Sequence, residues 1–201
     1  MELLIIRHGL PLRVENADGS AADPELAPNG HAQAQRLADW LATEHIDALY
    51  ASPMRRAQQT ALPVAQQLGL PIVTDHDVAE WDRDSAAYIP MEELKAAKDG
   101  TWEAFLRGEL SGPSNPDLFH KTVVDAIERI ISAHRGQTVA VVCHGGVINS
   151  YASHILGLGQ NVGFFHPSYT SINRVVAASS GERSIASLND TGHLRGTGLL
   201  A

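Results

Sequence analysis

Leu3-Leu4-Ile5-Ile6-Arg7-His8-Gly9 is the stretch that decides the fold, because four consecutive apolar residues run directly into an arginine, a histidine and a glycine. An apolar run without alternation is typical of a strand that is buried on both faces, as in a parallel sheet covered by helices. Ligands of open α/β sheets bind beyond the carboxyl ends of the strands. We therefore predict that Arg7 and His8 lie where this protein does its chemistry.

A second stretch repeats this pattern late in the chain, where the apolar residues 138–143 lead into His144-Gly145-Gly146. Strand and helix patterns alternate between and around these two stretches. They predict strands at residues 46–51, 71–74, 171–177 and 184–188. They predict helices at residues 30–44, from Ser52-Pro53 to about residue 68, and at residues 117–134 and 147–156. The alternation predicts an α/β fold, a three-layer α/β/α sandwich with a mostly parallel (mixed) central sheet, in a single domain over residues 1–201.

Three other segments have less regular patterns. Residues 10–28 read as a long irregular loop, and residues 90–107 as two short helices broken near Gly100. We expect a lid-like insertion at about residues 81–118 that covers the site. The glycine-containing tail from Thr191 is a candidate for disorder.

Composition excludes several classes of partner and location. The formal net charge of −8 disfavours nucleic acid and anionic membranes, which attract basic proteins. No apolar run is long enough to cross a bilayer. The single cysteine excludes an internal disulfide framework, and the chain enters a strand without a signal segment, so we expect a cytoplasmic location. A homodimer is left open.

Four segments, in order, resemble the motifs of one known family. They are Leu4-Ile5-Ile6-Arg7-His8-Gly9, residues 26–34, residues 52–61 with Arg56, and Val142-Cys143-His144-Gly145-Gly146. This chain is similar over most of its length to the histidine phosphatase superfamily, the phosphoglycerate mutase-like group of branch 1. His76-Asp77 resembles the proton-donor pair of the other branch, but the residues after Gly9 do not fit that branch.

The chemistry of phosphate esters explains the residue types in these motifs. A phosphomonoester carries two negative charges, so it needs several positive donors before a nucleophile can approach. Arg7 and Arg56 can bind the phosphate, although Arg55 is adjacent in the same motif, and neutral His8 can attack phosphorus. His144, if protonated among acidic neighbours, can bind the phosphate and stabilise the transition state. We expect no metal and no cofactor.

Several acidic residues could donate the proton that the leaving group needs, and Glu80 is the first candidate. Glu80 matches the acid of the family in place and type, but Trp81-Asp82-Arg83-Asp84-Ser85 replaces the residues that usually follow it. Asp77, Asp82 and Asp84 are therefore rival acids. A carboxyl near the leaving oxygen can donate its proton and later take one from water.

The catalytic set predicts an enzyme, a metal-independent phosphomonoesterase that acts on a small phosphorylated substrate. The interval from Glu80 to His144 is shorter than in the cofactor-dependent mutases of the group, which favours a phosphatase over phosphoglycerate mutase-type phosphotransfer. A catalytically silent domain that binds a phosphorylated ligand is a further alternative. Arg13 and Arg83 are candidates for contacting a second anionic group of the substrate.

Overall fold

The N-terminal apolar run forms a central strand of a six-stranded sheet. The computed structural model describes residues 1–97, 100, 115–159 and 163–200. Its main sheet has the order β4-β3-β6-β1-β7-β8. The strands are β1 (Glu2–Arg7), β3 (Ala48–Ala51), β4 (Ile72–Thr74), β6 (Thr138–Cys143), β7 (Ile172–Ala177) and β8 (Arg183–Asp190). The first four are mutually parallel and the last two join antiparallel, which confirms the mixed, mostly parallel sheet.

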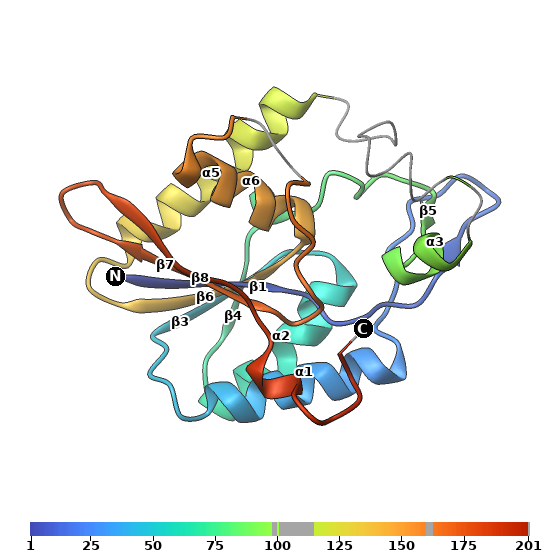
Figure 1. Ribbon diagram of the computed structural model, residues 1–201, viewed down its shortest axis with the longest axis horizontal. Helices are drawn as coiled ribbons and strands as arrows, with labels where there is room; N and C mark the ends of the chain where they lie inside the picture. Colours follow the sequence, from blue (N-terminus) through green and yellow to red (C-terminus); the bar gives the residue numbers. More distant parts are fainter. Residues whose placement is uncertain (98–99, 101–114, 160–162, 201) are drawn as a thin grey trace.

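Helices cover both faces of this sheet (Figure 1). The helices α1 (Pro28–Leu41) and α2 (Arg55–Leu68) lie on one face, and α5 (Pro116–Ala133) and α6 (Gly145–Leu156) lie on the other. Side chains alternate along a strand, so Leu4 and Ile6 join the core under α1 and α2, while Leu3 and Ile5 join the core under α5 and α6. The three-layer sandwich is therefore confirmed, and it explains why β1 is apolar at four consecutive positions.

The helix after β3 starts later than the sequence predicts. Ser52 and Pro53 precede α2, whose N-cap residue is Met54. The Ser52 hydroxyl accepts a hydrogen bond from the Met54 amide at 3.3 Å, so it shapes the turn before the helix. The helix continues through Pro63 and ends at Gly69, whose φ of 67° is the left-handed conformation predicted for its cap.

The insertion and the tail both form ordered structure in the described residues. β2 (Val14–Glu15) and β5 (Ala87–Tyr88) form a small two-stranded sheet. In the chain, β5 lies between the short η1 (His76–Val78) and α3 (Met91–Ala97). The second predicted short helix lies outside the described residues. The expectation of a disordered tail is wrong: Leu194 in η2 (Gly192–Leu194) is 2% exposed, and Gln33 of α1 donates a hydrogen bond to the Leu199 carbonyl at 2.8 Å.

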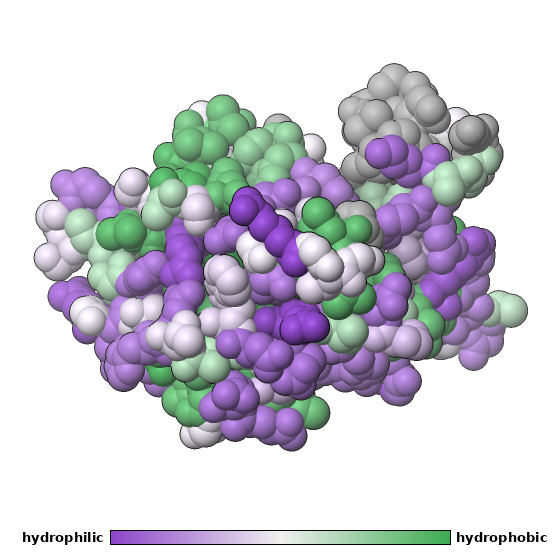
Figure 2. Space-filling view, turned by 60° about the horizontal axis from the view of Figure 1, so that its bottom comes forward, coloured by the Kyte–Doolittle hydropathy of each residue, from purple (hydrophilic) through white to green (hydrophobic). Residues whose placement is uncertain are grey.

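The surface is mixed in polarity. On the face shown in Figure 2, hydrophilic residues predominate and hydrophobic residues gather in separate patches. None of the helices within the described ranges is both long and apolar enough to span a membrane.

Candidate active site

The carboxyl ends of three parallel strands bring the predicted residues together. Arg7 pairs with Cys143 in the register of β1 and β6, and Ala51 of β3 pairs with Val142 of β6. The residues that end or follow these strands, Arg7, His8, Ser52 and His144, therefore meet at one edge of the sheet. The ring centres of His8 and His144 are 5.1 Å apart, so the two histidine motifs lie side by side.

His8 is held in one tautomer. Its ring is 2% exposed, and Nδ1 donates a hydrogen bond of 2.7 Å to the Gly9 carbonyl, so Nε2 carries the free lone pair. Burial, and then the charges of Arg56 and Arg7, lower the pKa of His8 well below its usual value. A neutral imidazole with a free Nε2 is the form that can act as a nucleophile.

The turn after His8 is fixed by close backbone packing. The Gly9 amide donates to the Thr60 hydroxyl on α2 at 2.9 Å. A side chain at Gly9 would place its Cβ 2.7 Å from the Gly30 carbonyl oxygen, and one at Gly30 would place its Cβ 2.0 Å from the Leu10 oxygen. This crossing of two backbones requires glycine on both sides and sets the position of the His8 ring.

Arg7 is a buried cation with hydrogen-bonding capacity left over. It is 5% exposed, and Nη1 donates to the Pro167 carbonyl at 2.5 Å and to Nε2 of His166 at 3.3 Å. Its guanidinium lies 4.0 Å from the centre of the Tyr169 ring. Nε is buried and has no hydrogen-bond partner in the described structure. An anion is the natural partner for such a group.

Arg56, near the start of α2, is the second buried cation. It is fully buried, whereas the side chain of Arg55 remains 54% exposed and pairs with Glu25, so the buried arginine of the motif is Arg56. Nη2 of Arg56 donates to Asp82 at 3.3 Å, and its guanidinium lies 4.6 Å from the centre of the Tyr88 ring. Nε and Nη1 have no hydrogen-bond partner among the described residues.

His144 occupies the N-cap position of α6. Its Nε2 lies 2.7 Å from the Ser52 hydroxyl, and its buried Nδ1 has no partner within the described part of the chain. We expected acidic neighbours that would favour the charged ring. Instead, burial, and then Arg56, His8 and Arg7, lower the pKa of His144 well below its usual value, which favours the neutral ring.

Glu80 lies in the same site, where it faces the first turn of α6. It is 7% exposed and accepts hydrogen bonds from the amides of Gly146 at 2.9 Å and Trp81 at 3.2 Å. Burial, and then the charge of Asp82, raise the pKa of Glu80 to about 7. Such a carboxyl can both hold and release a proton near neutral pH.

The rival acids have different surroundings. Asp82 is also in the site: it pairs with Arg56, and burial raises its pKa despite that charge. Asp77 pairs with Arg129 of α5 at 3.1 Å, and Asp84 lies 3.7 Å from Arg83 with its own side chain 92% exposed. The structure therefore brings Glu80 and Asp82 into the site and places Asp77 and Asp84 outside it.

The two arginines considered for a second anionic group are engaged elsewhere. Arg13 pairs with Glu15 at 2.6 Å and with Glu93 at 3.1 Å. Arg83 is directed to Asp84. Both arginines pair with exposed carboxylates, and their contact with a substrate stays a prediction.

Sequence patterns do not single out Tyr169, Tyr88 or His166, although all three contact the buried arginines. Tyr169 precedes β7, and the Thr170 amide donates to the His8 carbonyl at 3.3 Å, so an antiparallel strand begins where β1 ends. The only feature of the sequence that could have indicated Tyr169 and His166 is the polar, aromatic segment before that strand. Nothing in the sequence marks Tyr88, which comes from the insertion.

Among the residues that the structure describes, no group of three or more His, Cys, Asp or Glu side chains is placed to hold a metal ion. The absence of a metal and of a cofactor stays a prediction.

Comparison with known proteins agrees with this geometry. The model of the histidine phosphatase superfamily (branch 1) matches residues 3–191. Phosphoglycerate mutase-like protein 4 of Arabidopsis thaliana is 28% identical over 99% of this chain and 89% of that protein. Putative phosphoserine phosphatase 2 of Hydrogenobacter thermophilus is 31% identical over 86% of this chain and 87% of that protein.

The fold is similar to solved structures as well. A mutant phosphoserine phosphatase of Entamoeba histolytica, in complex with phosphoserine, matches with a TM-score of 0.73 and 23% identity, over 96% of this chain and 98% of that one. Together, the matched family model, the two histidine motifs and the sheet topology lead to one conclusion: this chain belongs to branch 1 of the histidine phosphatase superfamily.

Proposed function

We propose that this chain is a metal-independent phosphatase that hydrolyses small phosphomonoesters through a phosphohistidine on His8. The observation that carries the proposal is the state of His8: Nδ1 is tied to the Gly9 carbonyl, and the ring is buried beside guanidinium groups with unpartnered N–H donors. A relative with the printed name putative phosphoserine phosphatase supports a small phosphoester as substrate.

In the first half of the proposed reaction, Arg7 and Arg56 bind the phosphoryl oxygens and Nε2 of His8 attacks phosphorus. The bond from phosphorus to the alcohol oxygen breaks as the P–N bond forms. Glu80 in its protonated form donates its proton to the leaving alcohol oxygen. The raised pKa of Glu80, about 7, supports this role, because the proton is available near neutral pH.

In the second half, the Glu80 carboxylate takes a proton from water as the water oxygen attacks phosphorus. The P–N bond breaks, His8 returns to its neutral form and inorganic phosphate leaves. His144 contributes positive charge to the transition state once a phosphate dianion has raised its pKa.

We extend the proposal to the organisation of the chain. Strands from both ends of the chain pair in one sheet, which supports a single domain over residues 1–201. Asp82 and Tyr88 approach Arg56 from the insertion at about 81–118, which supports its role in covering the site. The net charge of −8 supports partners other than nucleic acid or an anionic membrane, and the single cysteine agrees with a cytoplasmic location; a homodimer stays open.

The test is phosphate release from a panel of phosphomonoesters in the presence of a chelator. Wild-type protein should turn over, and His8→Ala should not. His120→Ala is the matched control, because His120 contacts Ser150 between α5 and α6 and should be dispensable. Rapid quenching should trap an acid-labile, alkali-stable phosphoenzyme in the wild type and in His120→Ala, but not in His8→Ala.

The other functions give different results in the same assay. Exchange between phosphoglycerates without phosphate release would identify a mutase. Binding without turnover in the wild type would identify the silent domain. Phosphate release that persists in His8→Ala would refute the phosphohistidine mechanism.

Glu80 and its rival Asp82 are separated by a second pair of variants. Glu80→Gln should abolish release of a poor leaving alcohol, while hydrolysis of an ester with an acidic leaving group should be affected less, since that group needs no proton. Asp82→Asn should retain turnover of both esters. The opposite pattern would assign the proton donor to Asp82.

A further inference from the structure

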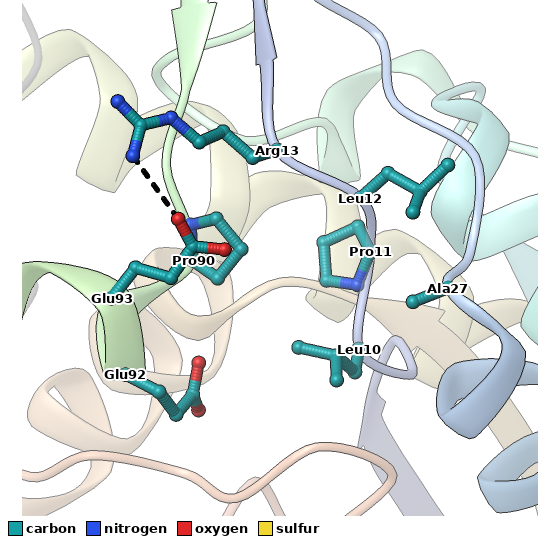
Figure 3. Close-up of a pocket in the computed structure, with 8 residues that line it drawn as sticks. All are labelled: Leu10, Pro11, Leu12, Arg13, Ala27, Pro90, Glu92 and Glu93. Atoms are coloured by element: carbon teal, nitrogen blue, oxygen red, sulfur yellow. Dashed lines mark hydrogen bonds and ion pairs between the residues drawn. The ribbon is translucent and has the colours of Figure 1, made fainter.

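A cavity lies beside the candidate phosphate site. It has a volume of about 220 Å³ and is lined by residues of the loop after Gly9 and by α3. Figure 3 shows Leu10 and Pro11 on one side, with Glu92 of α3 directed toward them across the cavity. Glu92 in the wall of this cavity bonds to Tyr169, whose ring packs on Arg7, so the cavity lies close to the candidate phosphate site.

Glu92 is connected to the phosphate site through one side chain. Its Oε2 accepts a hydrogen bond of 3.1 Å from the Tyr169 hydroxyl. The ring of Tyr169 is 1% exposed and lies 4.0 Å from the Arg7 guanidinium and 5.8 Å from the His8 ring. The Tyr169 side chain therefore bridges the Arg7 end of the site and the Glu92 carboxylate.

The phosphate end of this path is marked independently. Nε of Arg7 and both Nε and Nη1 of Arg56 are buried and have no hydrogen-bond partner in the described part of the chain. These N–H donors favour an anion beside the two arginines. The Glu92 carboxylate favours a cation or a hydrogen-bond donor in the cavity.

The other charged side chains that line the cavity, Arg13 and Glu93, form an ion pair with each other. Arg13 pairs with both Glu15 and Glu93, so its charge is balanced by two carboxylates. Glu92 instead receives its hydrogen bond from the neutral Tyr169 hydroxyl. The rest of the wall is apolar, from Leu10, Pro11 and Pro90, so a carboxylate or a second phosphate on the leaving group would face a negative charge and apolar side chains.

We propose that Glu92 is a specificity-determining residue that selects phosphate esters of short amino alcohols, with the substrate ammonium group on the Glu92 carboxylate and its methylene groups on the apolar wall. This inference rests on the proposed phosphatase function, because it assigns the leaving-group side of the same site. It names a class of substrate by its charge, and it places esters with anionic leaving groups among the poor substrates.

The test compares two esters that differ in one group. O-Phosphoethanolamine carries an ammonium group where 2-hydroxyethyl phosphate carries a hydroxyl. Wild-type protein should hydrolyse the ammonium ester with a kcat/KM about tenfold higher, because a half-buried carboxylate attracts the cation more than the hydroxyl. Glu92→Gln should bring the ratio of the two kcat/KM values to about one, mainly through KM for the ammonium ester.

Glu93→Gln is the matched control, since it removes the same charge from the same helix but leaves the partner of Tyr169 in place. Its ratio should stay close to that of the wild type. Equal kcat/KM values for the two esters in the wild type, or an equal loss of preference in both variants, would overturn the role of Glu92. If the wild type hydrolyses neither ester nor any other phosphomonoester, the phosphatase proposal itself fails, and this inference fails with it.

Discussion

Replacing Glu80 by glutamine should stabilise the protein at high pH while it removes the proposed proton donor. The pKa of Glu80 is raised from 4.5 to about 7 in the folded protein, mainly because the carboxylate is buried. The folded state therefore holds a proton that the unfolded state loses between these two pH values. Because the native state binds more protons in this interval, the free energy of unfolding falls as pH rises from about 4.5 to about 7.

The size of this effect follows from the same two pKa values. A pKa raised from 4.5 to about 7 corresponds to roughly 3 kcal/mol of lost stability above pH 7, as an upper value. Glutamine carries no charge and can still accept the Gly146 amide with its side-chain oxygen. Glu80→Gln should equal the wild type in stability near pH 4.5 and exceed it above pH 7, with a Tm higher by roughly 5–10 °C.

The assay is thermal and urea unfolding of both proteins from pH 4.5 to 8.5. Asp84→Asn is the control, because it removes an exposed carboxylate of the same segment. Its free energy of unfolding should differ from that of the wild type by a similar small amount at every pH. A stability difference for Glu80→Gln that does not change with pH, or that favours the wild type more as pH rises, would refute the view that burial holds Glu80 protonated.

Two further variants test how the site is positioned. Gly146→Ala should reduce kcat at least tenfold, because the new Cβ would lie 2.3 Å from Oε1 of Glu80 and must displace the carboxylate. Gly145→Ala, whose Cβ meets its nearest neighbour at 4.0 Å, is the matched control for folding of α6. Thr60→Val should lower the free energy of unfolding by about 1–3 kcal/mol in urea titrations, because the Gly9 amide loses its acceptor; an unchanged midpoint would contradict this hydrogen bond.

The sequence predicts the sheet and the meeting of its strand ends because both depend on local patterns. Residues 3–6 and 139–142 are apolar without alternation. A strand that is covered on both faces needs apolar side chains on both, so this pattern predicts a strand in the middle of a layered sheet. Parallel strands align their carboxyl ends, so Arg7, His8 and His144 must share one edge of the sheet. The position of Glu80 follows less directly, since it depends on the path of the chain after β4.

The surroundings of the site depend on distant segments and are not encoded locally. Tyr169 contacts Arg7 from the entry to β7, and Tyr88 contacts Arg56 from the insertion. The tail packs on α1 through Leu194, although its composition suggests disorder. Such contacts form between segments far apart in the chain, and a pattern read along one segment cannot reveal which distant segment covers it.

The neutral state of His144 shows why the charge of the site cannot be read from residue types alone. Burial lowers the pKa of His144, and the charges of Arg56, His8 and Arg7 lower it further, which favours the neutral ring. We expect a bound phosphate dianion to raise the pKa of His144, because its charge favours the charged ring and it offers an acceptor to Nδ1, which has no hydrogen-bond partner among the described residues. We therefore expect His144 to take up a proton as the dianion binds, because the arginines that favour the neutral ring also attract the anion that would charge it.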